Sequence, residues 1–264
     1  MKSVLDFAAA KSAGRKISMV TCYDSSRARV LVASAIDCIL VGDSAAMVVH
    51  GHSDTLAATV EMMALHTAAV RRGAPTRFLI GDLPFLSFRK GIPAALDAVA
   101  AFMRAGAQAV KLEGVAGHED VITAIVGSGV PVMGHLGLTP QSVNSLAGYR
   151  VQGRSEDAAA RIVEEAKRLE SLGCFSIVLE CVPSALGARI TQAVGIPTIG
   201  VGAGIHCDGQ VLVLQDLLGL TGGHRPRFVR TYFDGATAVR EAIDRFDSDV
   251  KQGSFPAAAE SYDA

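Results

Sequence analysis

The sequence predicts a (β/α)8 TIM barrel with an additional N-terminal helix, and three observations support this fold class. Short apolar runs alternate with longer helical patterns along the 264 residues, as they do in parallel α/β folds. The runs are rich in Val, Ile and Leu, which is typical of parallel strands buried on both faces. The length is usual for one such barrel, so we expect residues 1–264 to form a single domain.

Eight runs have the composition and length of buried strands. They are residues 17–22, 38–42, 78–81, 109–112, 130–134, 176–179, 198–201 and 211–214. A doubly wound open sheet could be built from the same alternating elements. Eight strands separated by helices favour the closed barrel.

Helix boundaries are indicated by capping residues. Ser3 can cap the N-terminal helix, with Asp6 three residues later as a weak capping box. Further helices are expected from Thr59 to Gly73, from the turn containing Pro93 to Gly106, and from Ser155 to near Gly173. We expect the polar, alanine-rich tail after Arg245 to pack loosely or at a subunit contact.

Composition and charge exclude several classes of protein. Half of the residues are hydrophobic and 19% are charged, which describes a packed globular chain. The net charge of −1 gives no general attraction to nucleic acid or to an anionic membrane, and no apolar run is long enough for a membrane span. The five cysteines form no C-x-x-C pair, so we expect neither disulfides nor a zinc knuckle, and a cytoplasmic location.

Polar residues lie where the apolar runs end. Because the carboxyl ends of barrel strands surround one mouth, residues distant in sequence are expected to converge there. Glu180 ends a strongly apolar run, where its pKa could be raised and it could act as a base. The candidate site residues are Asp43, Ser44, Asp82, Lys111, Glu113, His135 and Glu180.

Three of these residues suggest a metal site. Asp43, Asp82 and Glu113 would place three carboxylates in one pocket, where they would repel one another unless a cation were present. Carboxylates and waters are the ligands that Mg²⁺ prefers. Lys111 shares a strand face with Glu113, because side chains alternate along a strand. Burying these two charged groups destabilises the fold unless they pair with each other or bind a ligand.

Each residue also has a structural interpretation. A lone Asp after a strand is often a helix cap, and His135 could be a satisfied core histidine. Cys181 is better explained as a packing residue than as a nucleophile, because no His stands beside it in sequence. The glycine-rich residues 200–204 could cradle a phosphate, but a tight turn is the simpler explanation.

Many short motifs together resemble the ketopantoate hydroxymethyltransferase family over roughly residues 17–232. They are VGDS (41–44), GHSDT (51–55), HTAAVRRGA (66–74), DLPF (82–85), MRAGA (103–107), VKLEG (110–114), GHLGLTPQ (134–141), GYRVQGR (148–154), LECVP (179–183) and IGVGAG (199–204). Any one of these motifs is weak evidence for the family, whereas ten of them in the same order are specific evidence for it.

The resemblance implies a TIM-barrel enzyme that transfers a hydroxymethyl group from 5,10-methylenetetrahydrofolate to 3-methyl-2-oxobutanoate through a magnesium-stabilised enolate. It implies one Mg²⁺ per subunit and a homo-oligomer, commonly a decamer. The roles that it implies are metal binding by Asp43, Asp82 and Glu113, contact with the small 2-oxo acid by Asp43, Ser44, Asp82, Lys111 and His135, and proton abstraction by Glu180.

Two other functions are compatible with the same residues. A metal-dependent lyase acting on 2-oxo acids, such as a pyruvate aldolase or an enzyme of the phosphoenolpyruvate mutase type, would use similar carboxylates. Dependence on folate would indicate the hydroxymethyltransferase, whereas dependence on a free aldehyde would indicate the lyase. A non-catalytic barrel that serves as a binding or assembly module would show no metal affinity. The buried charges argue against it, because they would destabilise the fold without serving a function.

Overall fold

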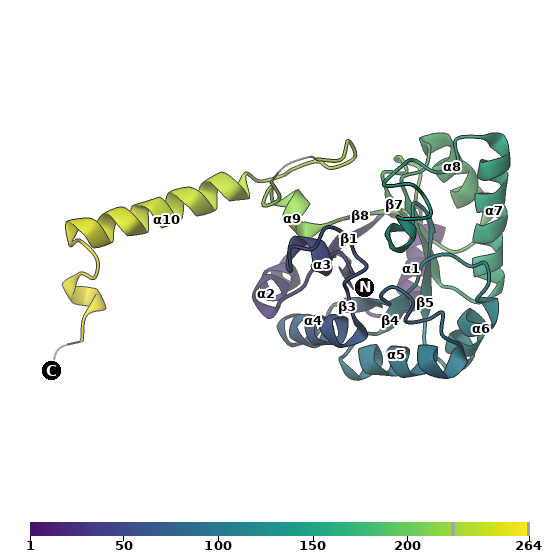
Figure 1. Ribbon diagram of the computed structural model, residues 1–264, viewed down its shortest axis with the longest axis horizontal. Helices are drawn as coiled ribbons and strands as arrows, with labels where there is room; N and C mark the ends of the chain where they lie inside the picture. Colours follow the sequence, from purple (N-terminus) through teal and green to yellow (C-terminus); the bar gives the residue numbers. More distant parts are fainter. Residues whose placement is uncertain (223–224, 263–264) are drawn as a thin grey trace. The chain divides into compact units, whose positions relative to one another are not determined.

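The computed structural model describes residues 1–222 and 225–262, and the chain forms two compact units, Met1–Val213 and Leu214–Ala264. The first unit is a closed barrel of eight parallel strands in the order β1 to β8, with helices around it (Figure 1). This confirms the predicted fold class. The division into units does not test whether the whole chain folds as one domain, so a single domain over 1–264 stays a prediction.

All eight strands overlap the predicted runs. They are β1 (Ile17–Thr21), β2 (Cys38–Val41), β3 (Phe78–Asp82), β4 (Ala109–Lys111), β5 (Val132–Gly137), β6 (Ser176–Glu180), β7 (Thr198–Val201) and β8 (Gly209–Leu212). Two strands are shifted from the prediction by more than one residue. The fifth begins after Pro131, which has no N–H for the ladder, and extends to Gly137. The eighth begins at Gly209, which pairs with β1 through backbone alone, and ends at Leu212.

The helices surround the strands of the first unit or form the second unit. They are α1 (Val4–Ser12), α2 (Ser25–Ala33), α3 (Ala45–Val48), α4 (Val60–Gly73), α5 (Ile92–Arg104), α6 (Glu119–Gly127), α7 (Glu156–Ser171), α8 (Ser184–Ala193), α9 (Leu214–Leu217) and α10 (Gly235–Gln252). The Thr59 and Ser155 side chains accept hydrogen bonds from the first turns of α4 and α7, which confirms both predicted starts.

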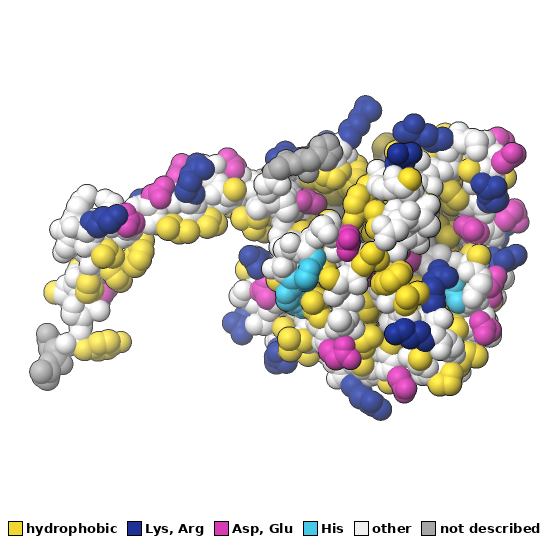
Figure 2. All heavy atoms as spheres, in the orientation of Figure 1, with side chains coloured by type: hydrophobic (Ala, Val, Ile, Leu, Met, Phe, Trp, Pro, Cys, Tyr) yellow, Lys and Arg dark blue, Asp and Glu magenta, His cyan; other side chains and the backbone are white. Residues whose placement is uncertain are grey.

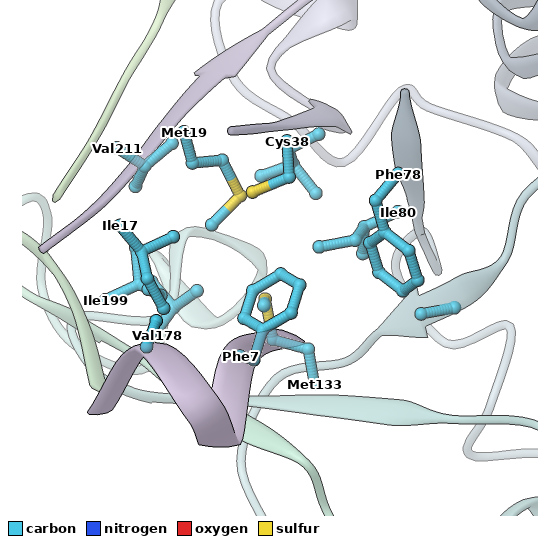
Figure 3. Close-up of a cluster of buried hydrophobic side chains, with 13 residues drawn as sticks. Phe7, Ile17, Met19, Cys38, Phe78, Ile80, Met133, Val178, Ile199 and Val211 are labelled. Carbon is cyan, nitrogen blue, oxygen red and sulfur yellow. The ribbon is translucent and has the colours of Figure 1, made fainter. Parts of the chain in front are cut away.

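Helix α1 closes the amino-terminal end of the barrel. Phe7 is fully buried, and its ring makes edge contacts with Phe78 at 5.4 Å and Phe175 at 5.1 Å between centroids. Its neighbours include Ile17 and Met19 of β1, in a cluster that also takes inward side chains from the other strands (Figure 3). Ile17 and Phe78 are the first residues of their strands, so α1 covers the end opposite the mouth.

Glycines inside two strands allow the outer helices to approach closely. A Cβ at Gly81 of β3 would lie 2.4 Å from the ring of Phe102 in α5. A Cβ at Gly134 of β5 would lie 2.5 Å from Leu169 in α7. The large side chains of the helices therefore occupy the space that a strand side chain would take.

The second unit contains an amphipathic helix. Exposed Val239, Ile243, Phe246 and Val250 recur at the spacing of one face of α10, and the apolar atoms gather along one side of it (Figure 2). The tail that was expected to pack loosely after Arg245 is therefore partly helical. In the described parts of both units, no helix is sufficiently long and apolar to cross a membrane.

Replacing Phe7 with Ala should destabilise the barrel by about 3–5 kcal/mol, because it removes a fully buried ring and leaves a cavity. The free energy of unfolding is measured by chemical denaturation. Leu5→Ala is the matched control, because Leu5 lies on the same helix but is 74% exposed. Equal effects of the two substitutions would contradict the role given to Phe7.

Candidate active site

The predicted residues converge at the carboxyl ends of the strands. Asp43 and Ser44 follow β2, Asp82 ends β3, Lys111 ends β4, with Glu113 two residues later, His135 lies in β5 and Glu180 ends β6. All are buried except Ser44 and Glu180, which are half-buried. Apart from Ser44, whose hydroxyl contacts Tyr23, these side chains are linked through the contacts described below, so the structure brings together most of the residues that the sequence singled out.

A buried ion pair lies at the centre of the cluster. Neighbouring strands β3 and β4 place Asp82 directly opposite Lys111. The Lys111 Nζ donates to both carboxylate oxygens of Asp82, at 2.7 and 2.8 Å. Burial opposes the charged form of Lys111, but Asp82, Glu113 and Asp43 outweigh burial and raise its pKa, so the amine stays protonated.

Asp43 stands beside this pair and adds negative charge. Its backbone N–H donates to Asp82 Oδ2 at 3.2 Å. Burial raises the pKa of Asp43 well above its ordinary value, and the charge of Asp82 raises it further. Burial also raises the pKa of Asp82, although Lys111 opposes that change. One lysine therefore does not neutralise the carboxylates gathered here.

Gln141 holds two of the carboxylates and was not identified from the sequence. Its backbone N–H donates to Glu113 Oε2 at 3.0 Å, and its side-chain Nε2 donates to Asp43 Oδ2 at 2.9 Å and to the Leu83 carbonyl at 2.9 Å. It lies in the 3-10 turn Pro140–Ser142, after β5. Its motif was recognised, but no periodicity indicates which side chain of an irregular turn points inward.

His135 lies between two glutamates. Its Nδ1 is 3.5 Å from Glu113 Oε1 and its Nε2 is 3.3 Å from Glu180 Oε2. These separations suit ion pairs better than aligned hydrogen bonds, and among the described residues neither ring nitrogen has a hydrogen-bond partner. Burial and Lys111 lower the pKa of His135, but the two glutamates outweigh them and raise it to about 9. A charged imidazole therefore connects Glu113 with Glu180.

Tyr23 supports Ser44 and was also missed by sequence reasoning. It follows β1, is almost fully buried, and its hydroxyl lies 2.8 Å from Ser44 Oγ. Burial raises the Tyr23 pKa, so the phenol stays protonated. The Tyr23 carbonyl contacts His66 Nδ1 at 2.6 Å, which helps fix the loop. An aromatic residue just after a strand gave no signal that distinguished this role from core packing.

The backbone after Glu180 adopts an unusual conformation. Cys181 has φ of 47°, in the left-handed region that a non-glycine residue seldom occupies. Its N–H donates to the Val201 carbonyl at 2.9 Å, and its own carbonyl accepts from the Gln152 N–H at 2.8 Å. Burial raises the thiol pKa to about 12, so the thiol stays protonated, which agrees with the packing interpretation of Cys181.

The glycine-rich turn after β7 packs against α8. A Cβ at Gly187 would lie 2.3 Å from the Ala203 carbonyl oxygen, and a Cβ at Gly204 would lie 2.0 Å from Ser184 Oγ. Gly204 also has φ of 84°. Close packing and a left-handed backbone therefore explain why glycine stands at 204, as the tight-turn interpretation expects.

The carboxylates have the chemistry of a hard-cation site, although they are not arranged as three ligands. Among the described residues, no three His, Cys, Asp or Glu side chains form a group that could hold a metal ion. Mg²⁺ commonly uses only one or two carboxylates together with waters. Asp43 and Asp82 fit that donor set, because burial raises both pKa values, the charge of Asp82 adds to the rise at Asp43, and the charge of Glu113 adds to the rise at Asp82. Glu113 Oε1 is buried without a hydrogen-bond partner.

Comparison with known proteins gives a family and close relatives. The model of the family described as ketopantoate hydroxymethyltransferase matches residues 2–258. The chain is 57% identical to a 3-methyl-2-oxobutanoate hydroxymethyltransferase from Bdellovibrio bacteriovorus, with 99% of this chain and 100% of the relative covered. It is 52% identical to the protein of that name from Coxiella burnetii, with 95% of each covered.

Solved structures share the fold at much lower identity. A 2,3-dimethylmalate lyase of the PEP mutase/isocitrate lyase superfamily matches with a TM-score of 0.62 and 17% identity, covering 94% of this chain and 87% of that one. A phosphonopyruvate hydrolase in complex with oxalate and Mg++ matches with a TM-score of 0.62 and 13% identity, covering 98% and 93%. Identities this low support the barrel fold alone.

Replacing Lys111 with Met should destabilise the protein by about 3–5 kcal/mol at pH 7, because Asp82 and Asp43 are then left buried without their cation. Loss of the cation raises their folded pKa values further above the unfolded ones. The penalty is therefore present above the folded pKa values and decreases as pH falls through them. Urea denaturation at pH 7 and pH 5 measures both effects.

Lys167→Met is the control for this prediction, because Lys167 forms an exposed pair with Glu164 at 2.7 Å. Its loss should cost at most about 1 kcal/mol. A pH-independent loss in Lys111→Met would show that packing, rather than charge, explains its destabilisation.

Proposed function

The chain belongs to the ketopantoate hydroxymethyltransferase family, and we propose that it transfers a hydroxymethyl group from 5,10-methylenetetrahydrofolate to 3-methyl-2-oxobutanoate. The product would be 2-dehydropantoate, in pantothenate biosynthesis. The observation that carries the proposal is the set of buried carboxylates beside Lys111, with Glu180 across His135 at the open side of the mouth. Such a site can bind a 2-oxo acid and remove its C3 proton.

Asp43 and Asp82 would hold one Mg²⁺ per subunit. Glu113, the third ligand expected from the sequence, is held by the Gln141 N–H and lies beside His135, and it would add negative charge nearby. When bound, the ion would polarise the keto oxygen of the substrate and neutralise developing negative charge. Two observations support this assignment: the excess of buried carboxylate over cation at Asp43 and Asp82, and the Mg++ and oxalate in the phosphonopyruvate hydrolase of the same fold.

The remaining groups would orient the 2-oxo acid. The Lys111 ammonium places fixed positive charge beside Asp82, where it favours an anionic substrate and the enolate derived from it. Ser44, held by Tyr23 at 2.8 Å, would contact the substrate carboxylate. Since Lys111 and Ser44 are positioned by other side chains before binding, little reorganisation is needed.

Glu180 would act as the base. It is half-buried, whereas Glu113 is almost fully buried, so Glu180 is the glutamate that a substrate can reach. It accepts the C3 proton, and the C–H electrons form the enolate. The enolate carbon then forms a bond to the methylene carbon of the folate iminium, and water replaces the folate nitrogen. His135, 3.3 Å from Glu180, keeps that carboxylate directed into the mouth.

The proposal also includes a homo-oligomeric assembly and a cytoplasmic location. The exposed apolar side of α10 suits contact with another copy of the chain, and the family resemblance implies a homo-oligomer, commonly a decamer. Every cysteine among the described residues is a free thiol, which suits the cytoplasm.

Glu180→Gln should reduce solvent deuterium exchange at C3 of 3-methyl-2-oxobutanoate by roughly 100-fold or more, because the amide cannot accept the proton. The exchange is followed by proton NMR without folate, and thermal melting checks the fold. Glu165→Gln is the control, because Glu165 lies on α7 outside the mouth. Exchange at the wild-type rate would remove Glu180 from the role of base.

Chelation should abolish product formation, because Asp43 and Asp82 would lose the ion that polarises the keto oxygen. The assay follows consumption of 3-methyl-2-oxobutanoate with and without methylenetetrahydrofolate, in EDTA and after addition of excess Mg²⁺. Full turnover in EDTA, or equal consumption without folate, would contradict the proposed reaction.

A further inference from the structure

A second cavity of about 280 Å³ lies beside the mouth, within the barrel unit. We call it the side cavity. The loops after β3, β4 and β5 form its wall on one side, and α7 forms the other. Its polar lining residues are Arg89, Thr139, Gln152, Arg161 and Glu165.

The side cavity is on the outer face of the strands. Leu136 lines it, whereas His135, the preceding residue in β5, contacts Glu113 and Glu180 in the mouth. Adjacent residues of a strand point to opposite faces. A ligand in the side cavity is therefore separate from a 2-oxo acid bound among the carboxylates.

The backbone nevertheless connects the side cavity closely to the mouth. Its lining includes Gly114, which directly follows Glu113, and Arg89 Nη2 donates to the Glu113 carbonyl at 3.1 Å. The Gln152 N–H donates to the carbonyl of Cys181, the residue after Glu180. A molecule long enough to span both spaces could have one end at the reacting groups and the other in the side cavity.

The charge of the side cavity favours an anion. Arg89 and Arg161 line it, and among the described residues neither pairs with a carboxylate within 4.0 Å. Glu165 also lines it, so two cations face one carboxylate. Burial raises the pKa of Glu165, although the charges of Arg161 and Arg168 oppose that change. Guanidinium groups bind carboxylates through paired hydrogen bonds.

Apolar surface accompanies these charges. Val115, Leu136 and Ile162 line the side cavity together with the arginines. A ligand that matches both features has an apolar or aromatic segment next to a carboxylate. A folate has this character, because its glutamate follows an aromatic segment and lies far from its one-carbon group.

We propose that the side cavity binds the benzoyl-glutamate tail of the folate co-substrate, with Arg161 and Arg89 contacting its carboxylates. This inference rests on the proposed function, because it assigns a site to the donor of that reaction. The pterin and its one-carbon group then lie over the mouth, within reach of the enolate carbon. The tail supplies binding energy at a distance from the reacting atoms.

Kinetics of Arg161→Gln test the proposal, with Arg168→Gln as the matched control. Arg168 lies on the same helix, is exposed and pairs with Glu119, outside the side cavity. Arg161→Gln should raise the KM for methylenetetrahydrofolate about tenfold, the size expected for one lost charge-assisted contact. The KM for 3-methyl-2-oxobutanoate and its C3 exchange without folate should keep wild-type values, as should every constant of Arg168→Gln.

A binding measurement separates this proposal from the proposed reaction. Calorimetry with N-(4-aminobenzoyl)-L-glutamate, 4-aminobenzoate and inorganic phosphate should give binding of the first, weakened in Arg161→Gln, and little binding of the others. Equal binding of phosphate, or a folate KM within twofold of wild type in Arg161→Gln, overturns the proposal. If the wild type binds aminobenzoyl-glutamate through Arg161 yet makes no product from folate, the reaction fails and the tail site stands.

Discussion

Unbalanced negative charge, buried where the strands end, is the constraint on which the rest of the mouth depends. Asp43 and Asp82 are almost fully enclosed, and one lysine, Lys111, pairs with Asp82. Such charge is tolerated only where donors surround it. Lys111, the Asp43 N–H and the Gln141 amide meet part of that need. The remainder is the charge that the proposed Mg²⁺ would neutralise.

The same constraint explains which features could be predicted from sequence. Strands buried on both faces are composed mainly of Val, Ile and Leu, so their positions could be predicted from the sequence. An acidic residue directly after such a run is unusual and could therefore be recognised as a candidate site residue. Gln141 and Tyr23 were missed because their roles depend on where irregular segments place them, and their residue types are ordinary in loops and cores. The predicted start of the fifth strand was wrong because Pro131 lies within an apolar run but has no N–H for strand pairing, so β5 begins at Val132.

The barrel is common to enzymes of different chemistry, and its mouth alone does not choose among them. The lyase and hydrolase that share the fold do so at 17% and 13% identity, whereas the hydroxymethyltransferases match over essentially the full chain at 57% and 52%. A shared barrel therefore does not settle the reaction, and in the proposed one-carbon transfer the place for the second substrate is what the fold alone does not supply.

The closure of the barrel floor by α1 separates the part of the barrel that sets its stability from the part that carries the site. Phe7 and its aromatic neighbours hold the strands together at the end farthest from the charged groups. Residues that share no partner usually affect stability independently. Substitutions in this aromatic floor can therefore change stability without touching the groups at the opposite rim.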